Sequence, residues 1–534
     1  MSKYFTHFLR RWWPSTGRYF AAIAVFLTAC IVLGGGTREG FLSDVILQAA
    51  AVPLLLWSAC RLLEVPREAG GRRARWALSI CAAAALVPLA QLVPLPPSLW
   101  TLLPGRADFE SNLLAAGLQV GWLPLSVSPR ATWLGLLALL PPAAMFLGVL
   151  HLSYADRRRL TVVMLALGLI SVALGLLQVA QGRTSPLRFF AFTNTSEAVG
   201  FFANRNHYSA LLYCLVLVAA AWSVDAVTHF TDGRTRLRRA SRSLVTIILS
   251  FTALVILVGA QAMARARAGL VLTPIALIGA FAFASLVPTG NFDEGSIGRR
   301  GTATRTWRRL LIATVSLSVL FGAQLAIYRI GERFAQNPLD DARVPFARNT
   351  IAAAIAYMPF GSGIGTFVSV YPEFEKATDG TGEIFVNRAH NDFLELWLET
   401  GVAGLIASLL FLIWLVCIML RIWRRGMPGG AYKDNLLASA ATLILVLLLA
   451  HSTVDYPLRT TALMAVFAMS AAMALAPVGV EQIPSDRYRR DDEEPSAPAR
   501  DADVSARPRR STFVPAPPPQ GDWPAAWRDP KDLR

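Results

Sequence analysis

The strongest constraint on the fold is a series of apolar runs about twenty residues long, the length that a helix needs to cross a bilayer. With 54% hydrophobic and 16% charged residues over 534 positions, the chain is too apolar for a soluble protein of this size. The sequence therefore predicts an all-α, polytopic membrane protein with about twelve transmembrane helices. The predicted spans cover residues 19–36, 42–62, 75–93, 131–152, 160–181, 207–227, 243–263, 269–288, 310–328, 398–420, 436–456 and 459–476.

The basic residues indicate how these spans are oriented. The net charge of +16 could suggest nucleic acid, but the arginines and lysines form short clusters between the spans and in the tail, so no nucleic-acid partner is expected. Because cytoplasmic loops carry such clusters, both termini are predicted to be cytoplasmic and the 329–398 loop to lie on the opposite side. The clusters occupy residues 61–75, 157–159, 234–242, 299–309 and 421–425.

The sequence predicts two parts, a membrane domain over residues 1–476 and a disordered cytoplasmic tail over 477–534. The tail is rich in charge and proline and poor in large apolar residues. Residues 1–18 place basic side chains before the first run, but no convincing small-residue cleavage site follows, so this span is expected to stay uncleaved. All five cysteines fall inside apolar runs without metal-site spacing, so neither a disulfide nor a metal site is predicted.

The densest polar cluster, residues 387–404, runs directly into an apolar span. Asp392 and Glu395 have capping-box spacing, which predicts that a helix begins near His390 and leaves the imidazole at its positive end. His390 could act as a base near neutral pH, although a loop histidine satisfied by its own hydrogen bonds explains it equally well when it is taken alone. Its polar neighbours are Arg388, Asn391, Glu395 and Glu399.

Arg265 and Arg267 lie in a tight turn between two apolar runs, on the side where the positive-inside bias disfavours them. Two arginines that snorkel to the membrane interface are one interpretation. The alternative is an anionic partner at headgroup depth, since a guanidinium fork matches the oxygens of a diphosphate bidentately.

Other polar motifs are less informative individually. The glycine-rich residues 360–367 are better explained as a structural turn than as a phosphate-binding loop, because no strand-helix unit frames them. Residues 204–207 (Asn-Arg-Asn-His) and the polar positions of 451–459 are each explained by packing or capping when taken singly. Arg348 carries little information without support from elsewhere.

Taken together and in order, five motifs resemble those of the O-antigen ligase and O-antigen polymerase superfamily, over about residues 90–475. Residues 91–96 and 126–132 also resemble its polymerase-like exopolysaccharide members. The five motifs are residues 202–207, 264–269, 361–367, 389–394 and 451–459.

The resemblance implies an inverting, metal-independent glycosyltransferase that needs no cofactor. It would be a multi-pass protein of the bacterial inner membrane with a periplasmic catalytic loop over 329–398. Its donor would be an undecaprenyl-diphosphate-linked glycan, and its acceptor would be lipid A-core or a polysaccharide. Membrane lipid would surround the protein.

The resemblance also implies roles for individual residues. His390 matches the family's essential histidine and Arg267 the arginine of its Ser-Arg-small-Gly motif, while Ala266 in place of serine leaves the register between Arg265 and Arg267 open. These three are the predicted catalytic residues: the arginines would meet the charge of the leaving diphosphate, and His390, held by Asp392 or Glu395, would activate the acceptor. The predicted substrate-binding residues are Arg348, Arg388, Asn391, Glu395, Arg205, His207, Asp455 and Arg459.

Two other classes of function compete with this interpretation. A transporter or flippase of an anionic solute or lipid-linked glycan would place ionisable residues near the middle of its spans and use paired broken helices. Few such residues are present, because the charges gather at the outer surface. A scaffold that binds envelope partners through its tail leaves the outer polar cluster unexplained.

Overall fold

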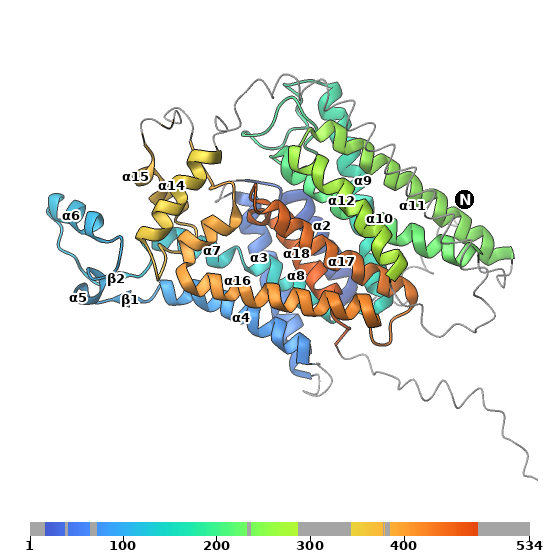
Figure 1. Ribbon diagram of the computed structural model, residues 1–534, viewed down its shortest axis with the longest axis horizontal. Coiled ribbons are helices and arrows are strands. Elements are labelled where there is room, and N and C mark those ends of the chain that lie inside the picture. The colour runs from blue at the N-terminus through green and yellow to red at the C-terminus, as the bar shows by residue number, and fades with distance from the viewer. Residues whose placement is uncertain are drawn as a thin grey trace, which may run out of the picture. The chain divides into compact units, whose positions relative to one another are not determined.

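The computed structural model describes residues 17–37, 41–64, 72–231, 237–286, 343–376, 379 and 385–478. The chain divides into two compact units, Met1–Gln482 and Ile483–Arg534, and every described residue lies in the first. Within it, helices dominate (Figure 1). The predicted span at 310–328 lies outside the described residues, as does the predicted tail from residue 479 onward.

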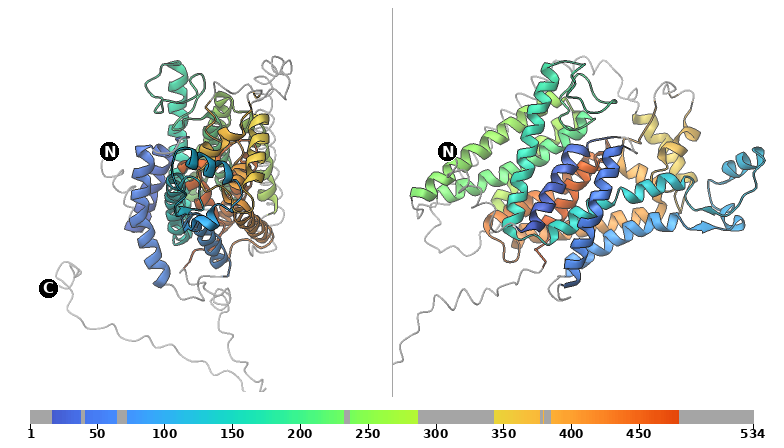
Figure 2. Two further views of the ribbon diagram at one scale, coloured as in Figure 1. Left: turned by 90° about the vertical axis from the view of Figure 1, so that its left-hand side faces the viewer. Right: turned by 180° about the vertical axis from the view of Figure 1, so that it is seen from behind.

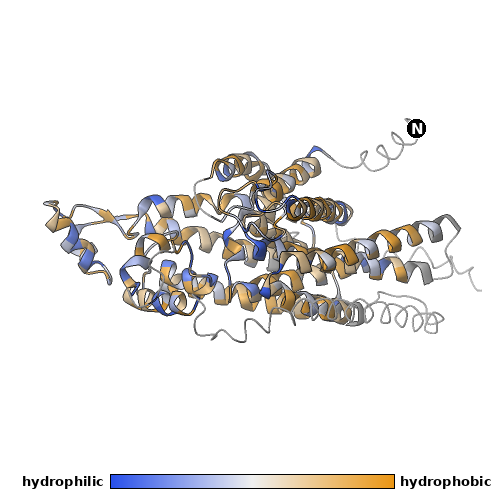
Figure 3. Ribbon diagram, turned by 90° about the horizontal axis from the view of Figure 1, so that it is seen from above, coloured by the Kyte–Doolittle hydropathy of each residue, from blue (hydrophilic) through white to orange (hydrophobic). Residues whose placement is uncertain are grey.

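The helices follow the predicted spans. Among the described residues, eight helical stretches are long and apolar enough to cross a membrane and three further apolar helices are shorter, so the protein is a helical membrane protein. Hydrophobic residues cover most of their length (Figure 3). The helices are α2 (Arg18–Leu33), α3 (Leu42–Glu64), α4 (Arg72–Gln91), α5 (Pro97–Trp100), α6 (Ala107–Ala115), α7 (Pro129–Leu137), α8 (Leu140–Leu150), α9 (Tyr154–Ala180), α10 (Arg205–Thr231), α11 (Leu237–Ala264), α12 (Arg267–Leu286), α14 (Arg343–Ala356), α15 (Phe367–Phe374), α16 (Asp392–Arg425), α17 (Tyr432–His451) and α18 (Thr461–Met473).

Helix α10 forms the centre of the bundle, since its side chains from His207 to Val227 are almost all buried. It contacts α9, α11, α12 and α17. The two ends of the described chain also meet, because α2 lies beside α18 (Figure 2). This packing brings the loops before α10, α12 and α16 and the loop after α17 to the same end of the bundle.

A short excursion separates α4 from α7. It holds α5, α6 and a two-stranded antiparallel sheet, in which β1 (Pro94–Leu95) pairs with β2 (Leu123–Pro124). Arg106 anchors the excursion from inside: its guanidinium lies over the rings of Trp100 and Tyr357, at 5.7 and 5.1 Å from their centroids. Burial lowers the pKa of Arg106 to about 10, which still leaves it charged at neutral pH.

The basic residues at 157–159 make contacts that join parts of the bundle. Arg157 is only 3% exposed and donates to the carbonyl oxygens of Val149 (3.2 Å) and Leu150 (3.1 Å) at the end of α8. Arg158 forms a bidentate pair with Asp434 at the start of α17. These residues therefore satisfy helix-end carbonyls and join neighbouring helices, which the loop charge alone did not predict.

Helix α16 begins two residues after His390, close to the predicted start, but its cap differs from the predicted one. Asn391 is the N-cap, and its Oδ1 accepts from the backbone N–H groups of Phe393 (3.0 Å) and Leu394 (3.1 Å). The helix runs through the predicted span at 398–420 and continues on both sides of it. It is kinked at Gly401, whose φ of 56° is in the left-handed region that favours glycine.

Candidate active site

His390 is held by a carboxylate from the loop that follows α17. Its Nδ1 lies 3.0 Å from Oδ1 of Asp455. The His390 side chain is 23% exposed, whereas the Asp455 side chain is 1% exposed, so the imidazole is accessible while its partner is buried. Phe346 stacks on the imidazole with centroids 5.8 Å apart, and Tyr456 meets it edge-on at 4.9 Å. The ring is therefore fixed in position by packing as well as by a hydrogen bond.

This partner defines which nitrogen of His390 can act as a base. Burial alone would raise the pKa of Asp455, but the hydrogen bond from His390 and the nearby histidines hold that pKa well below its usual range. The ionised carboxylate can only accept hydrogen bonds, so Nδ1 of His390 carries a hydrogen. In the neutral ring Nε2 then keeps its lone pair and can accept a proton. The predicted partners of His390, Asp392 and Glu395, were wrong.

Asp455 also borders a polar cavity of about 110 Å³. Its second carboxylate oxygen, Oδ2, accepts from Nδ2 of Asn206 at 2.6 Å. Three arginines from three different helices, α10, α12 and α14, contribute to the wall, and this concentration of positive charge fits an anionic ligand. The cavity is lined by Arg205, Asn206, Arg267, Ala268, Arg343, His451, Val454 and Asp455.

Two of the predicted catalytic residues have unusual backbones. Among the described non-glycine residues, only Arg265 (φ 50°) and His390 (φ 52°) have positive φ. Such conformations are costly for residues with a Cβ and gather at functional sites. In each case the left-handed residue stands two positions before a helix begins, at α12 and at α16.

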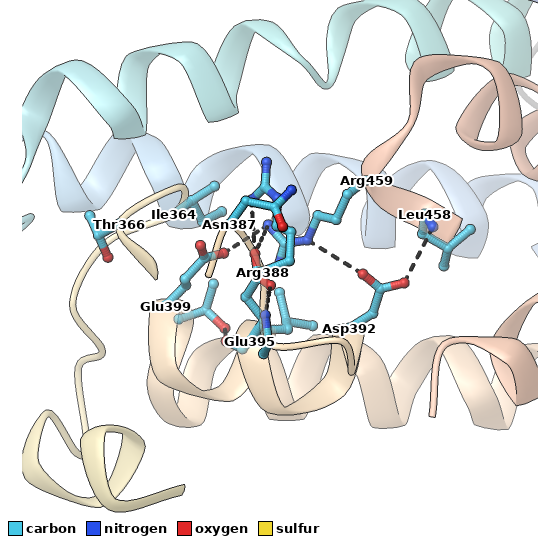
Figure 4. Close-up of polar contacts among 12 residues, drawn as sticks. Ile364, Thr366, Asn387, Arg388, Asp392, Glu395, Glu399, Leu458 and Arg459 are labelled. Atoms are coloured by element: carbon cyan, nitrogen blue, oxygen red, sulfur yellow. Dashed lines mark hydrogen bonds and ion pairs between the residues drawn. The ribbon is translucent and has the colours of Figure 1, made fainter. Parts of the chain in front are cut away.

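A buried network of charges supports the start of α16 (Figure 4). Arg388 donates to Glu395 at 2.8 Å, and the backbone N–H of Ala389 donates to the other oxygen of Glu395 at 3.0 Å. Arg459 reaches Glu399 at 2.9 Å and comes within 3.5 Å of Glu395 and Asp392. The carboxylates at the entrance to this span thus have protein partners, and Ala389, next to His390, is tied to them.

Arg459 is the hub of that network. Burial alone would lower the pKa of Arg459, but the charges of Glu395, Glu399 and Asp392 raise it above its ordinary value, so the guanidinium stays protonated. Asp392 also accepts from the hydroxyl of Ser452 at 2.7 Å. The loop after α17 is therefore attached to α16 on one side of Asp455, and this attachment helps to position the carboxylate that holds His390.

The glycine-rich loop has the structural role that the sequence favoured. Gly361, Gly363 and Gly365 all have positive φ. A Cβ added at Gly361 would lie 2.6 Å from the carbonyl oxygen of Glu399, and one at Gly401 would lie 2.1 Å from that of Pro359. The loop thus fits against the kink of α16 through direct backbone contact.

Residues of the two polymerase-like motifs secure this contact. Gln91 donates to the carbonyl oxygen of Glu399 at 2.8 Å and accepts from the backbone N–H of Ile364 at 3.0 Å. Thr132 bonds to Ser126 at 2.7 Å and to the carbonyl oxygen of Ile364 at 2.9 Å. These motifs therefore support the kink of α16 through the glycine-rich loop.

The remaining predicted residues have different surroundings. Arg265 is exposed and does not line the polar cavity. Arg348 forms an ion pair with Asp379. The Asn391 side chain caps α16 and donates to the carbonyl oxygen of Thr453. His207 is fully buried with its ring edge-on to Tyr456 at 4.9 Å.

The cavity wall contains three residues that the predicted site left out, Arg343, Asn206 and His451. Asn206 and His451 belong to two of the family-like motifs, beside the predicted residues Arg205 and Asp455, and this position in the sequence was the available signal. Arg343 lies five residues before Arg348 and carried no motif of its own. Only the packing of α14 against the site identifies it.

A second, larger cavity of about 400 Å³ lies among α4, α8, α16 and α18. Its wall is apolar apart from a few side chains, which include Asp392 and Ser452 at the end near the loop after α17. That loop contributes Ser452 and Leu458 to this cavity and Val454 and Asp455 to the polar one. A single loop therefore borders both cavities.

Comparison with known protein families finds a match that includes part of this site. The family model described as O-Antigen ligase matches residues 237–409, a shorter stretch than the resemblance over about 90–475. No curated protein matches the chain. The matched stretch includes Arg267, Arg343 and His390. The resemblance is thereby confirmed over residues 237–409, which hold three of the five motifs (264–269, 361–367 and 389–394), and this stretch of the membrane protein matches the O-antigen ligase family.

Proposed function

We propose that the protein transfers or polymerises an undecaprenyl-diphosphate-linked glycan on the periplasmic face of the bacterial inner membrane. The family implies an activity of ligase or polymerase type. The observation that carries the proposal is that Asp455 both orients His390 and lines a cavity with Arg205, Arg267 and Arg343. The carboxylate of Asp455 thus contacts the proposed base, His390, and also forms part of the wall that would bind the anion.

In the proposed step, Nε2 of His390 takes the proton of an acceptor hydroxyl while that oxygen attacks the anomeric carbon of the donor sugar. The bond from the anomeric carbon to the diphosphate oxygen breaks, and its electron pair leaves with the lipid diphosphate. Attack opposite the leaving group inverts the anomeric centre. The arginines meet the charge that develops on the diphosphate, which is where preformed electrostatic stabilisation lowers a barrier most.

The lipid portion of the donor also needs a place in this scheme. A lipid diphosphate has a charged head joined directly to a long apolar chain. The polar cavity and the apolar cavity border the same loop, so a head in the first and a chain extending toward the second suit one such molecule. This arrangement supports a lipid-linked donor in preference to a free nucleotide sugar.

The arginines give the experiment that tests the proposed function. In purified protein reconstituted with lipid-linked donor and acceptor, wild type should form a new glycosidic bond, also in EDTA. Arg267→Lys should reduce transfer at least tenfold, because an ammonium keeps the charge but loses the planar fork. Arg265→Lys is the matched control and should be milder, since Arg265 lies outside the cavity wall.

Two results would contradict the proposal. If both lysine variants transfer glycan as fast as wild type, Arg267 does not bind the diphosphate through two hydrogen bonds of its planar guanidinium. A reconstituted protein that moves an anionic solute or the lipid-linked glycan across the bilayer, without forming any glycosidic bond, would replace the enzyme by a transporter.

The orientation of the site is tested separately. Helix α16 is 34 residues long, so its two ends lie on opposite sides of a bilayer in the proposed topology. A cysteine at exposed Glu373, within the predicted periplasmic loop, should react with an impermeant thiol reagent in intact spheroplasts. A cysteine at exposed Arg425 should react only after lysis. The reverse pattern would put the site on the cytoplasmic face.

A further inference from the structure

His451 is a second histidine near Asp455, and it lies in the wall of the polar cavity. It is the last residue of α17, is fully buried and lines the cavity beside Arg267 and Asp455. Its Nδ1 lies 3.1 Å from the hydroxyl of Tyr213, whereas its Nε2 is buried with no protein partner among the described residues. A buried ring nitrogen without a partner is costly unless a ligand satisfies it.

The bond to Tyr213 decides what this nitrogen offers. Consider His451 as a neutral imidazole. If its Nδ1 carried the hydrogen and donated to the phenol oxygen of Tyr213, the tyrosine O–H would lack an acceptor and Nε2 would hold an unused lone pair. If the tyrosine donates to Nδ1 instead, its O–H is satisfied and Nε2 carries the hydrogen. The second arrangement leaves one unmatched group, an N–H, in a wall that also contains arginines.

We propose that His451 donates its Nε2–H to a phosphate oxygen of the bound lipid diphosphate, and that Tyr213 is a positioning residue that fixes the required tautomer. This inference rests on the proposed function of the same site. His451 is thus a substrate-contacting residue distinct from His390: the first donates to the leaving group, while the second accepts a proton from the acceptor. A hydrogen bond at Nδ1 sets each of these two roles, from Tyr213 at His451 and with Asp455 at His390.

Binding of farnesyl diphosphate to the purified protein in nanodiscs, measured by calorimetry, tests the proposal. His451→Phe should weaken binding by about ten- to a hundredfold, the range for losing a hydrogen bond to a charged group. His451→Gln should retain most of the affinity, because its amide can present an N–H near the position of Nε2. His151→Phe is the matched control: this buried histidine also has an unpartnered Nε2 near a tyrosine, but it lies outside the cavity.

The tautomer gives a readout that a purely structural role would not change. In protein with ¹⁵N-labelled histidines, comparison with His451→Gln assigns His451 among the six histidines of the chain. Wild type should show a protonated Nε2 at His451, and Tyr213→Phe should shift that signal toward an average of both tautomers. Tyr213→Phe should weaken binding less than His451→Phe, and should weaken it no further in the His451→Phe background.

The outcomes separate this inference from the proposed function. If wild type binds farnesyl diphosphate and Arg267→Lys does not, but His451→Phe binds as wild type does, the role of His451 is overturned and the function stands. Should His451→Phe fail to fold, two other measurements decide. Retained binding by His451→Gln together with a protonated Nε2 in wild type supports the inference, and a protonated Nδ1 in wild type contradicts it. Absence of diphosphate binding by folded wild type would overturn both.

Discussion

Replacing His390 with alanine is expected to reduce glycan transfer by about 10²- to 10⁴-fold, the usual contribution of a positioned general base. Binding of the lipid diphosphate should change little, because it rests on the arginines of the cavity wall. The measurement is transfer from lipid-linked donor to acceptor in reconstituted protein, paired with calorimetric binding of the same diphosphate. Loss of rate with intact binding separates a base from a residue that only holds the substrate.

Asp455→Asn provides the companion variant. An amide in place of the carboxylate no longer requires the hydrogen of His390 on Nδ1, so the ring can adopt the tautomer in which Nε2 carries the hydrogen and cannot accept a proton. Transfer should again fall by orders of magnitude with the fold intact. The control is His151→Ala, because His151 is a buried histidine outside both the polar cavity and the His390–Asp455 pair. For His390→Ala, either normal transfer or the combined loss of binding and folding would contradict the assignment of His390 as the base.

The second large effect is expected at Arg459, and it concerns stability. Arg459→Leu keeps much of the volume but leaves Asp392, Glu395 and Glu399 without the guanidinium that lies within 3.5 Å of all three. Breaking a buried ion pair by removing one partner typically costs about 3–5 kcal/mol. Thermal unfolding in detergent should therefore show a clear fall in the apparent melting temperature.

The control for Arg459 is Arg348→Leu. The Arg348 side chain is 56% exposed, so solvent screens its pair with Asp379 and its loss should lower the melting temperature far less. Adding Glu399→Gln to Arg459→Leu should restore part of the loss, since one unpaired carboxylate is neutralised. A melting temperature of Arg459→Leu equal to that of wild type would mean that the network contributes nothing to the fold and that the site is positioned by other contacts.

The spans were predictable from the sequence because a bilayer-crossing helix is defined by its own residues. Apolar runs over twenty positions and the residues that end them are local features, so the span predicted at 160–181 and helix α9 (Tyr154–Ala180) nearly coincide. Helix α16 shows the limit. Its apolar length was visible, but the kink at Gly401 depends on a backbone contact with Pro359 that no local pattern contains.

The partners within the site were less predictable for the same reason. His390 was singled out by its neighbours along the chain, and those neighbours suggested Asp392 or Glu395 as its carboxylate. In the fold these two turn toward Arg459, and Asp455, 65 positions away, takes the imidazole. Sequence spacing shows which residues share a helix face, but the packing of α14, α16 and α17 decides which loops meet.

The left-handed backbone at His390 has a consequence for how sequences of this kind diverge. Glycine would adopt this backbone at a lower cost, by about 1 kcal/mol. Under the proposed function, chains that transfer glycan must keep the imidazole despite that cost, whereas a descendant that has lost the activity is free to accept glycine or asparagine there. The residue two positions before α16 is therefore expected to distinguish working copies from decayed ones in newly sequenced genomes.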